Sequence, residues 1–258
     1  MAKPVRWQLW YTLLAFLYMY LPITVLAVFS FNASSSSSRW EGFSFQWYAK
    51  LWQSDALFVA LRNSLTVAVT AVAVAAVLGT LIAVGLARYQ FPGRSLYRGV
   101  TYLPVIIPDI AIAVATLVFF GAIALPLSLG TIVLAHIVFC LAYISVVVSS
   151  RLAGLDPRLE EAALDLGATP VVAFIQVLLP QLIPGILSGC LLAFVLSMDD
   201  FVIAYFTSGV GATTLPVAIF SRIRTGVTPE LNALSVLLIG LSGTIALVAE
   251  FIRSRDRA

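Results

Sequence analysis

Residues 63–87 read NSLTVAVTAVAVAAVLGTLIAVGLA and contain no charged side chain. A helix rises about 1.5 Å per residue, so about 20 apolar residues cross the hydrocarbon core of a bilayer, which is about 30 Å thick. Because lipid offers no hydrogen-bond partners, the backbone of such a segment must satisfy its own polar groups. The stretch therefore predicts a transmembrane α-helix, and the rest of the chain has to fit that fold class.

The same pattern recurs along the chain of 258 residues, of which 61% are hydrophobic and 10% charged. Soluble domains are about 45–50% apolar and about 25% charged. A β-barrel would need short segments of alternating polarity, which the sequence lacks. We therefore predict an all-α membrane protein with about six transmembrane helices, at residues 9–31, 62–87, 100–123, 128–150, 181–206 and 231–252.

The N-terminal apolar run begins at Leu9 and follows the basic residues Lys3 and Arg6. A cleaved signal peptide has a shorter apolar core and a small-residue cleavage site, so we expect this run to be a retained first helix. The two cysteines, Cys140 and Cys190, both lie in apolar runs, so neither a disulfide framework nor a metal site is expected. The formal charge of +3 is too small to indicate nucleic acid, and no cofactor is expected.

Basic residues are divided unequally between the two sides that six spans create. Ten of the 15 lie on the side of the termini: Lys3, Arg6, Arg88, Arg94, Arg98, Arg151, Arg158, Arg253, Arg255 and Arg257. The other side has Arg39, Lys50, Arg62, Arg222 and Arg224. Since basic loops stay in the cytoplasm, the distribution predicts that both termini are cytoplasmic.

The cytoplasmic segment between the fourth and fifth spans, residues 155–180, reads LDPRLEEAALDLGATPVVAFIQVLLP. Asp156-Pro157 is a helix start, Gly167 is a helix stop, and Thr169-Pro170 is a second start. The pattern predicts a helix–turn–helix with small residues at its centre and carboxylates nearby. Such a unit could dock a partner protein, but an amphipathic connector would have the same pattern.

Within this segment, Glu161-Ala162-Ala163, Gly167 and Val177-Leu178-Leu179-Pro180 resemble the EAA---G---------I-LP signature of ABC importer permeases, with Val177 in place of isoleucine. The resemblance implies a type I permease fold and a coupling helix that sits in a groove of a cytoplasmic ATPase subunit. It implies one permease domain over residues 1–258, with an N-terminal helix at 9–31, core helices at about 62–252 and the coupling segment at 155–180. The ATPase-coupling residues would be Glu161, Ala162, Ala163, Gly167 and Pro180.

No GxxxxGK[ST] phosphate loop occurs in the sequence. The chain therefore cannot hydrolyse ATP by that route, and any dependence on ATP must come from a partner subunit. We expect a transport subunit and not an enzyme.

Three acidic residues, Asp109, Asp199 and Asp200, fall inside the expected spans, whereas no lysine or arginine lies well inside any of them. Charges within a span are costly and usually mark a pathway or a paired contact. An acidic interior without basic residues suits a cationic passenger. Alternatively the aspartates cap broken helices, and Asp109 follows Pro104 and Pro108, where local unwinding is expected.

Four further stretches resemble the permease subunits of spermidine/putrescine importers, and specifically the second permease of the pair. They are LAHIVFCLAY (134–143), LSMDDFVIAY (196–205), GATTLP (211–216) and PELNA (229–233). The resemblance implies a bacterial inner-membrane complex in which a periplasmic binding protein delivers a polyamine to two different permeases driven by two ATPase subunits. Tyr143 and Tyr205 could then join the three aspartates along the pathway through cation–π contacts.

Other functions fit the residues less well. A proton-coupled secondary transporter could use the aspartates and His136 as a relay, but it predicts symmetry between halves and leaves the coupling signature unexplained. A hydrogen-bonded core role suits the lone His136 better. An intramembrane enzyme would need a nucleophile with a base, or a metal motif such as HExxH, and neither is found. A permease for another cationic or small solute stays open.

Overall fold

The computed structural model describes residues 6–35, 39–226, 229–240 and 244, and over these residues the chain is helical, with one isolated β-bridge between Asn32 and Phe43. The elements, in chain order, are α1 (Arg6–Phe29), α2 (Gln46–Trp52), α3 (Asp55–Arg88), α4 (Arg94–Ile106), α5 (Asp109–Ala122), α6 (Leu129–Ala153), α7 (Arg158–Asp165), α8 (Pro170–Ala173), the π-helix η1 (Phe174–Leu178), α9 (Leu179–Asp199), α10 (Val202–Thr207) and α11 (Leu215–Thr225). A last helix covers Pro229–Gly240. The predicted fold class is confirmed.

Four helices in the described part of the chain are long and apolar enough to cross a membrane: Trp7–Phe29, Asp55–Arg88, Leu129–Ala153 and Pro170–Asp199. They correspond to the first, second, fourth and fifth predicted spans. The fourth combines α8, η1 and α9, so the second short helix predicted in the cytoplasmic segment is the beginning of a spanning helix. The predicted span at 231–252 lies partly in Pro229–Gly240, and its remainder is outside the described residues.

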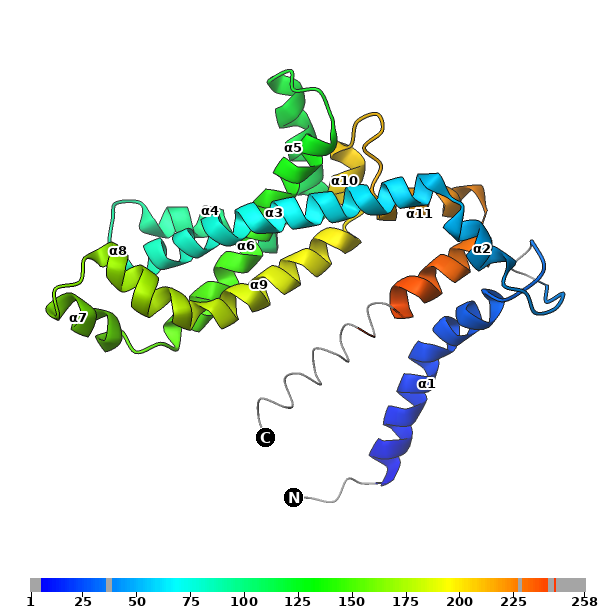
Figure 1. Cartoon of the computed structure of the whole chain (residues 1–258), viewed down its shortest axis with the longest axis horizontal. Helices are drawn as coiled ribbons and strands as arrows, with labels where there is room; N and C mark the ends of the chain where they lie inside the picture. Colours follow the sequence, from blue (N-terminus) through cyan, green and yellow to red (C-terminus); the bar gives the residue numbers. More distant parts are fainter. Residues whose placement is uncertain (1–5, 36–38, 227–228, 241–243, 245–258) are drawn as a thin grey trace. The chain divides into compact units, whose positions relative to one another are not determined.

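The predicted span at 100–123 is a pair of helices, α4 and α5, bent by 112° with respect to each other. Figure 1 shows α5 turning away from α4. Ile107 and Pro108 between them are extended, with ψ near 138°. Proline has no N–H to donate and disfavours a helical residue before it, so the chain breaks where Pro108 stands. The expected unwinding before Asp109 is confirmed.

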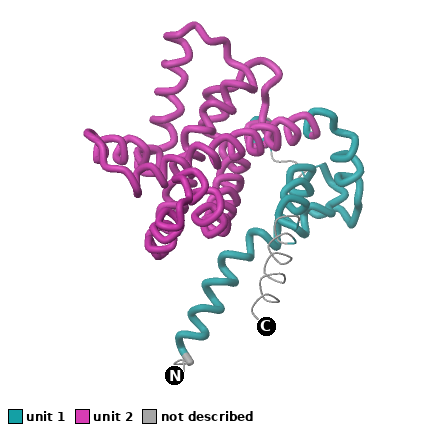
Figure 2. The backbone as a smooth tube through the Cα atoms, turned by 60° about the vertical axis from the view of Figure 1, so that its left-hand side comes forward, with its two compact units in different colours: residues 1–57, 219–258 teal, residues 58–218 magenta. Residues whose placement is uncertain are grey.

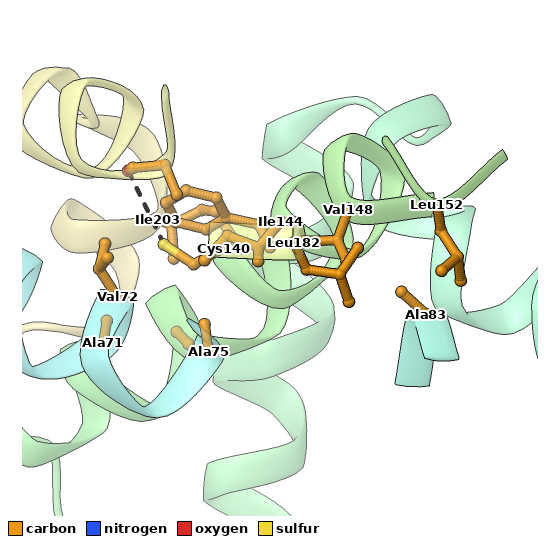
Figure 3. Packing of buried hydrophobic residues seen from close by; sticks show 14 of the residues in the cluster. Ala71, Val72, Ala75, Ala83, Cys140, Ile144, Val148, Leu152, Leu182 and Ile203 are labelled. Carbon is orange, nitrogen blue, oxygen red and sulfur yellow. Dashed lines mark hydrogen bonds between the residues drawn. The ribbon is translucent and has the colours of Figure 1, made fainter. Parts of the chain in front are cut away.

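The chain forms two compact units, residues 1–57 with 219–258, and residues 58–218 (Figure 2). In the second unit, α6 packs against α9 and α4. Its buried core includes Ala75, Cys140, Ile144, Leu182 and Ile203 (Figure 3). The Cys140 thiol is fully buried and contacts the Ala193 carbonyl at 3.8 Å.

Two glycines allow the long helices to approach α6 closely. A Cβ atom on Gly79 of α3 would lie 3.2 Å from Cγ2 of Ile144, and one on Gly189 of α9 would lie 3.3 Å from its Cα. Small residues at such crossings let helix backbones pack tightly in a membrane, where dispersion and not water exclusion holds helices together. This contact fixes the position of α6 relative to α3 and α9, and α6 carries part of the site described next.

In the first unit, polar contacts hold the segment after α1. The Trp47 indole donates to the carbonyl of Asn32, and the Tyr48 hydroxyl bonds that of Ser30. Glu230 pairs with Lys50 at 3.4 Å and with Arg222 at 2.5 Å.

Candidate functional site

A cavity of about 250 Å³ opens in the second unit beside the middle of α6. It is enclosed by the start of α5, the middle of α6, the end of α9 and the first turn of α10. Its lining residues are Asp109, Phe139, Tyr143, Leu196, Asp199, Asp200, Phe201, Val202 and Ile203. All three aspartates predicted from the sequence therefore meet at one cavity, although Asp109 is far from the other two in the chain.

Asp109 and Asp199 lie where two helices end at the cavity. Asp109 is the first residue of α5, and Asp199 is the last residue of α9. Both residues are exposed, and neither makes a hydrogen bond or an ion pair within the described part of the chain. Nothing in this part of the protein competes with a ligand for these two carboxylates.

Asp200 has a structural role as well. With ψ near 120° it leaves the helical conformation and ends α9. Its Oδ1 accepts from the Ile203 amide at 3.3 Å and its Oδ2 accepts from the Ala204 amide at 2.8 Å. These bonds satisfy amides at the start of α10 that have no helical partner. The capping alternative thus describes Asp200, whose side chain still lines the cavity.

His136 of α6 lies behind Asp200 and is 1% exposed. Its Nδ1 is 2.7 Å from the hydroxyl of Ser197, and its Nε2 is 3.3 Å from Oδ2 of Asp200. The ring packs against that of Phe139, with 5.0 Å between the centroids. The expectation of a hydrogen-bonded core histidine agrees with these contacts.

The two tyrosines singled out from the sequence differ in position. Tyr143 lines the cavity, but Tyr205 is not among its lining residues; it is 48% exposed, and its ring lies 5.3 Å from that of Phe201. Tyr205 therefore lies outside the cavity lining, and its place on the passenger's pathway stays a prediction. Phe139 lines the cavity but was not singled out by number from the sequence, although its spacing of four from Tyr143 puts both on one face of α6.

The electrostatics of the cavity are one-sided. Among the described residues, no lysine or arginine lines it, and the described histidine, cysteine, aspartate and glutamate side chains form no group suited to a metal ion. The three carboxylates can attract an organic cation by their negative charge. The aromatic side chains beside them also favour a positive charge, and the aliphatic walls suit its apolar part. The arrangement offers a binding or transit site for a cation.

The segment between α6 and α9, residues 155–180, forms the predicted helix–turn–helix. Oδ1 of Asp156 accepts from the Arg158 amide at 3.0 Å at the start of α7, and Oγ1 of Thr169 accepts from the Val172 amide at 3.4 Å at the start of α8. Gly167 between them has φ of +89°, the left-handed conformation that glycine adopts without cost. The start and stop signals read from the sequence are confirmed.

Much of the surface of α7 is not covered by other described parts of this chain. Glu161, Ala162 and Pro180 are exposed and Ala163 is half-buried. Leu159 and Leu164 are exposed, and Leu166 is 89% exposed. An apolar patch beside acidic side chains is typical of a surface that contacts another protein.

Two features of this segment were not visible in the sequence. Glu160, next to the signature residue Glu161, pairs with Arg88 at the end of α3, at 2.8 Å. The five residues Phe174–Leu178 form a π-helix that includes the signature position Val177 and ends directly before Leu179-Pro180. π-Helical turns are rare and frequent at functional sites. Ion pairing between distant segments and π-helical hydrogen bonding leave no local sequence signal.

Comparison with known proteins assigns the family. The profile described as "Binding-protein-dependent transport system inner membrane component" matches residues 75–254. The chain is 44% identical to the putrescine transport system permease protein PotI of Escherichia coli (strain K12), over 96% of this chain and 91% of that protein. It is 40% identical to the spermidine/putrescine transport system permease protein PotC of Haemophilus influenzae, over 93% of each.

The fold agrees with this assignment. A chain from the crystal structure of a bacterial ABC transporter that imports the acidic polysaccharide alginate superposes with a TM-score of 0.74 at 13% identity, covering 97% of this chain and 99% of that one. The predicted ABC importer permease fold is thereby confirmed. By the family match and by identity over nearly its whole length, the chain belongs to the inner membrane components of binding-protein-dependent transport systems.

Proposed function

We propose that this chain is the permease subunit through which an ATP-driven importer moves polyamines, putrescine or spermidine, across a bacterial inner membrane. One observation carries the proposal: Asp109, Asp199 and Asp200 meet at one cavity that no described lysine or arginine lines. The relatives named for putrescine and spermidine/putrescine transport support this passenger.

The cavity suits a flexible chain with a positive charge at each end. A carboxylate–ammonium contact at about 4 Å is worth about 4 kcal/mol at an effective dielectric of about 20, before desolvation is subtracted. Tyr143 and Phe139 add aromatic faces, each worth about 0.5–1 kcal/mol to a cation at an exposed site. Leu196 and Val202 offer apolar contacts to the methylene groups between the charges.

ATP hydrolysis is the work of a partner, as in the ABC permeases to which this chain is related. In the proposed complex two copies of a cytoplasmic ATPase drive transport, and this chain pairs with a second, different permease. The exposed face of α7, with Glu161 at its centre, docks on one ATPase subunit. A periplasmic binding protein delivers the passenger, in keeping with the family description.

The whole chain, residues 1–258, then acts as one transmembrane domain with both termini in the cytoplasm. The excess of basic residues on the side of the termini supports this orientation. It also places α7 where a cytoplasmic ATPase can reach it.

The test is transport by the complex that co-purifies with the tagged chain, reconstituted in vesicles with its binding protein. We expect an ATPase to co-purify, and we expect putrescine or spermidine to stimulate ATP hydrolysis and to enter the vesicles. The neutral analogue 1,4-butanediol is the matched control and should neither stimulate ATP hydrolysis nor enter the vesicles faster when ATP is present. Stimulation by a different small cation alone would replace the polyamine with that solute, and a chain that purifies without an ATPase would contradict the proposal.

A further inference from the structure

His136 touches the cavity wall without lining the cavity. It projects from α6 and reaches two other elements, α9 through Ser197 and the α9–α10 junction through Asp200. The ring is buried, and Nε2 makes no regular hydrogen bond to any described residue. Nε2 lies 3.3 Å from Oδ2 of Asp200, close enough for electrostatic attraction but without the alignment of a regular hydrogen bond.

The chemistry of the two neighbours decides which ring nitrogen carries hydrogen. An ionised carboxylate can only accept, so the contact with Asp200 is favourable when Nε2 carries the hydrogen. In a neutral imidazole the other nitrogen then accepts, and a serine hydroxyl can donate to it. Ser197 therefore favours the tautomer that carries its hydrogen at Nε2, the ring nitrogen nearest Asp200. A buried N–H without a full hydrogen bond is costly, which favours keeping the carboxylate close to it.

Three groups contact the two carboxylate oxygens of Asp200. The amides of Ile203 and Ala204 hold it toward α10, and His136 holds Oδ2 from the side of α6. Asp200 also lines the cavity, together with Asp109 and Asp199. A carboxylate fixed from two sides meets an arriving ammonium group in one orientation, without the entropy cost of ordering it first.

We propose that His136, oriented by Ser197, is a positioning residue that fixes the Asp200 carboxylate for the cationic passenger. The inference rests on the proposed function, because it assumes that Asp200 meets the passenger. It assigns to His136 a role in passenger affinity and none as a proton relay. The unit is then a chain of three side chains, Ser197, His136 and Asp200, that links α6 and α9 to the capped start of α10.

The experiment measures putrescine uptake in vesicles containing the complete complex, as a function of concentration, for five variants. His136→Leu keeps volume but removes both ring nitrogens. His136→Gln keeps a donor that can reach Asp200. Ser197→Ala removes the orienting hydroxyl, and Asp200→Asn serves as the background for a double variant with His136→Leu.

We expect His136→Leu to raise the KM for uptake about tenfold with Vmax within about twofold, because it removes the buried polar contact that holds the charged Asp200 side chain. His136→Gln should restore the KM to within about threefold, and Ser197→Ala should raise it in the same direction as His136→Leu but less. In the Asp200→Asn background His136→Leu should add nothing, because residues acting as one unit are not additive. If the His136→Leu complex fails to assemble, the KM values of Ser197→Ala and His136→Gln test the proposal in its place.

An unchanged KM in His136→Leu would overturn the proposal. A KM for His136→Gln as high as that for His136→Leu would also overturn it, since the loss of packing alone would then explain the effect. A further rise in KM when His136→Leu is added to Asp200→Asn, as large as in the wild-type background, would overturn it as well. Hydrogen exchange of the amides at 202–207 separates this inference from the proposed function. If the wild-type complex carries no polyamine, the proposed function fails. The inference then still requires faster exchange in His136→Leu and wild-type exchange in His136→Gln, and equal exchange in all three proteins would refute it.

Discussion

Gly167 is a residue whose role as a helix stop could be predicted from the sequence alone. Its place after a short amphipathic run predicted a helix stop, and its φ of +89° confirms it. Asp200 could be read only in part. The sequence identified an acid inside a span, but the capping role depends on the chain leaving the helix at that residue, which no local pattern encodes.

At Gly167 we expect substitution by valine to impair coupling. A β-branched residue in the left-handed region costs about 1–2 kcal/mol, which would rotate α7 relative to α8. Substrate-stimulated ATPase activity of the reconstituted complex should fall severalfold. Gly167→Asn should retain most of it, because asparagine tolerates this conformation. Gly99→Val, at an exposed helical glycine with open space around it, is the matched control; equal loss at both positions would show that the turn is not responsible.

Among the helices, the positions at which a helix breaks were more predictable than the contacts between helices. Pro104 and Pro108 predicted the unwinding before Asp109, because proline acts on its own helix. The span predicted at 181–206 ended too late, because the spanning helix Pro170–Asp199 ends at Asp199 and α10 is a separate helix. The pair between Arg88 and Glu160, by contrast, joins helices 72 positions apart in the chain, and the sequence gives no indication of it.

The Arg88–Glu160 pair leads to a prediction about coupling. It joins the end of α3 to α7, so Glu160→Gln should release this attachment of the docking helix. Both side chains are about a quarter exposed, and a pair of this kind is worth at most about 1 kcal/mol, so the yield of the complex should not change. Stimulated ATPase activity should fall about twofold to fivefold, because losing this energy shifts the equilibrium between attached and detached positions of α7 by about that factor.

The exchanged pair, Arg88→Glu with Glu160→Arg, provides the control, because it restores the attraction with the charges reversed. We expect it to recover most of the stimulated activity. Activity that is normal in Glu160→Gln, or lost equally in the exchanged pair, would exclude this contact from coupling.

For the whole molecule, the sequence predicted fold class, family and the location of most spans, since these depend on composition, apolar run length and a long signature. It predicted the three aspartates of the cavity but not Phe139, and it placed Tyr205 at the pathway although Tyr205 is not among the residues that line the cavity. The reason is geometric: a cavity wall depends on how α5, α6, α9 and α10 meet, which spacing within one segment does not determine.

Orientation is the whole-molecule property that labelling can check. In a background without Cys140 and Cys190, a cysteine at Ser35 should react with an impermeant reagent added to intact cells. A cysteine at Thr169 should react only after the inner membrane is opened. These outcomes follow from the excess of basic residues on the side of the termini. The opposite accessibility at the two positions would reverse the orientation and remove α7 from the cytoplasm.

The central claim, that the acidic cavity carries a polyamine, depends most directly on Asp199. This carboxylate lines the cavity and makes no bond within the described part of the chain, so replacing it removes charge without removing a structural contact. Asp200→Asn should also slow transport, but there the cap is altered as well. The control is Glu41→Gln, which removes an exposed carboxylate that is not part of the cavity lining.

The measurement is uptake of labelled putrescine and spermidine by vesicles containing the complete complex, alongside complex yield and ATPase content. For Asp199→Asn we predict uptake at least about tenfold slower, because even a third of the roughly 4 kcal/mol of attraction at 4 Å corresponds to that factor. Yield should match wild type, and Glu41→Gln should transport normally. Full uptake by Asp199→Asn in an intact complex would contradict the account.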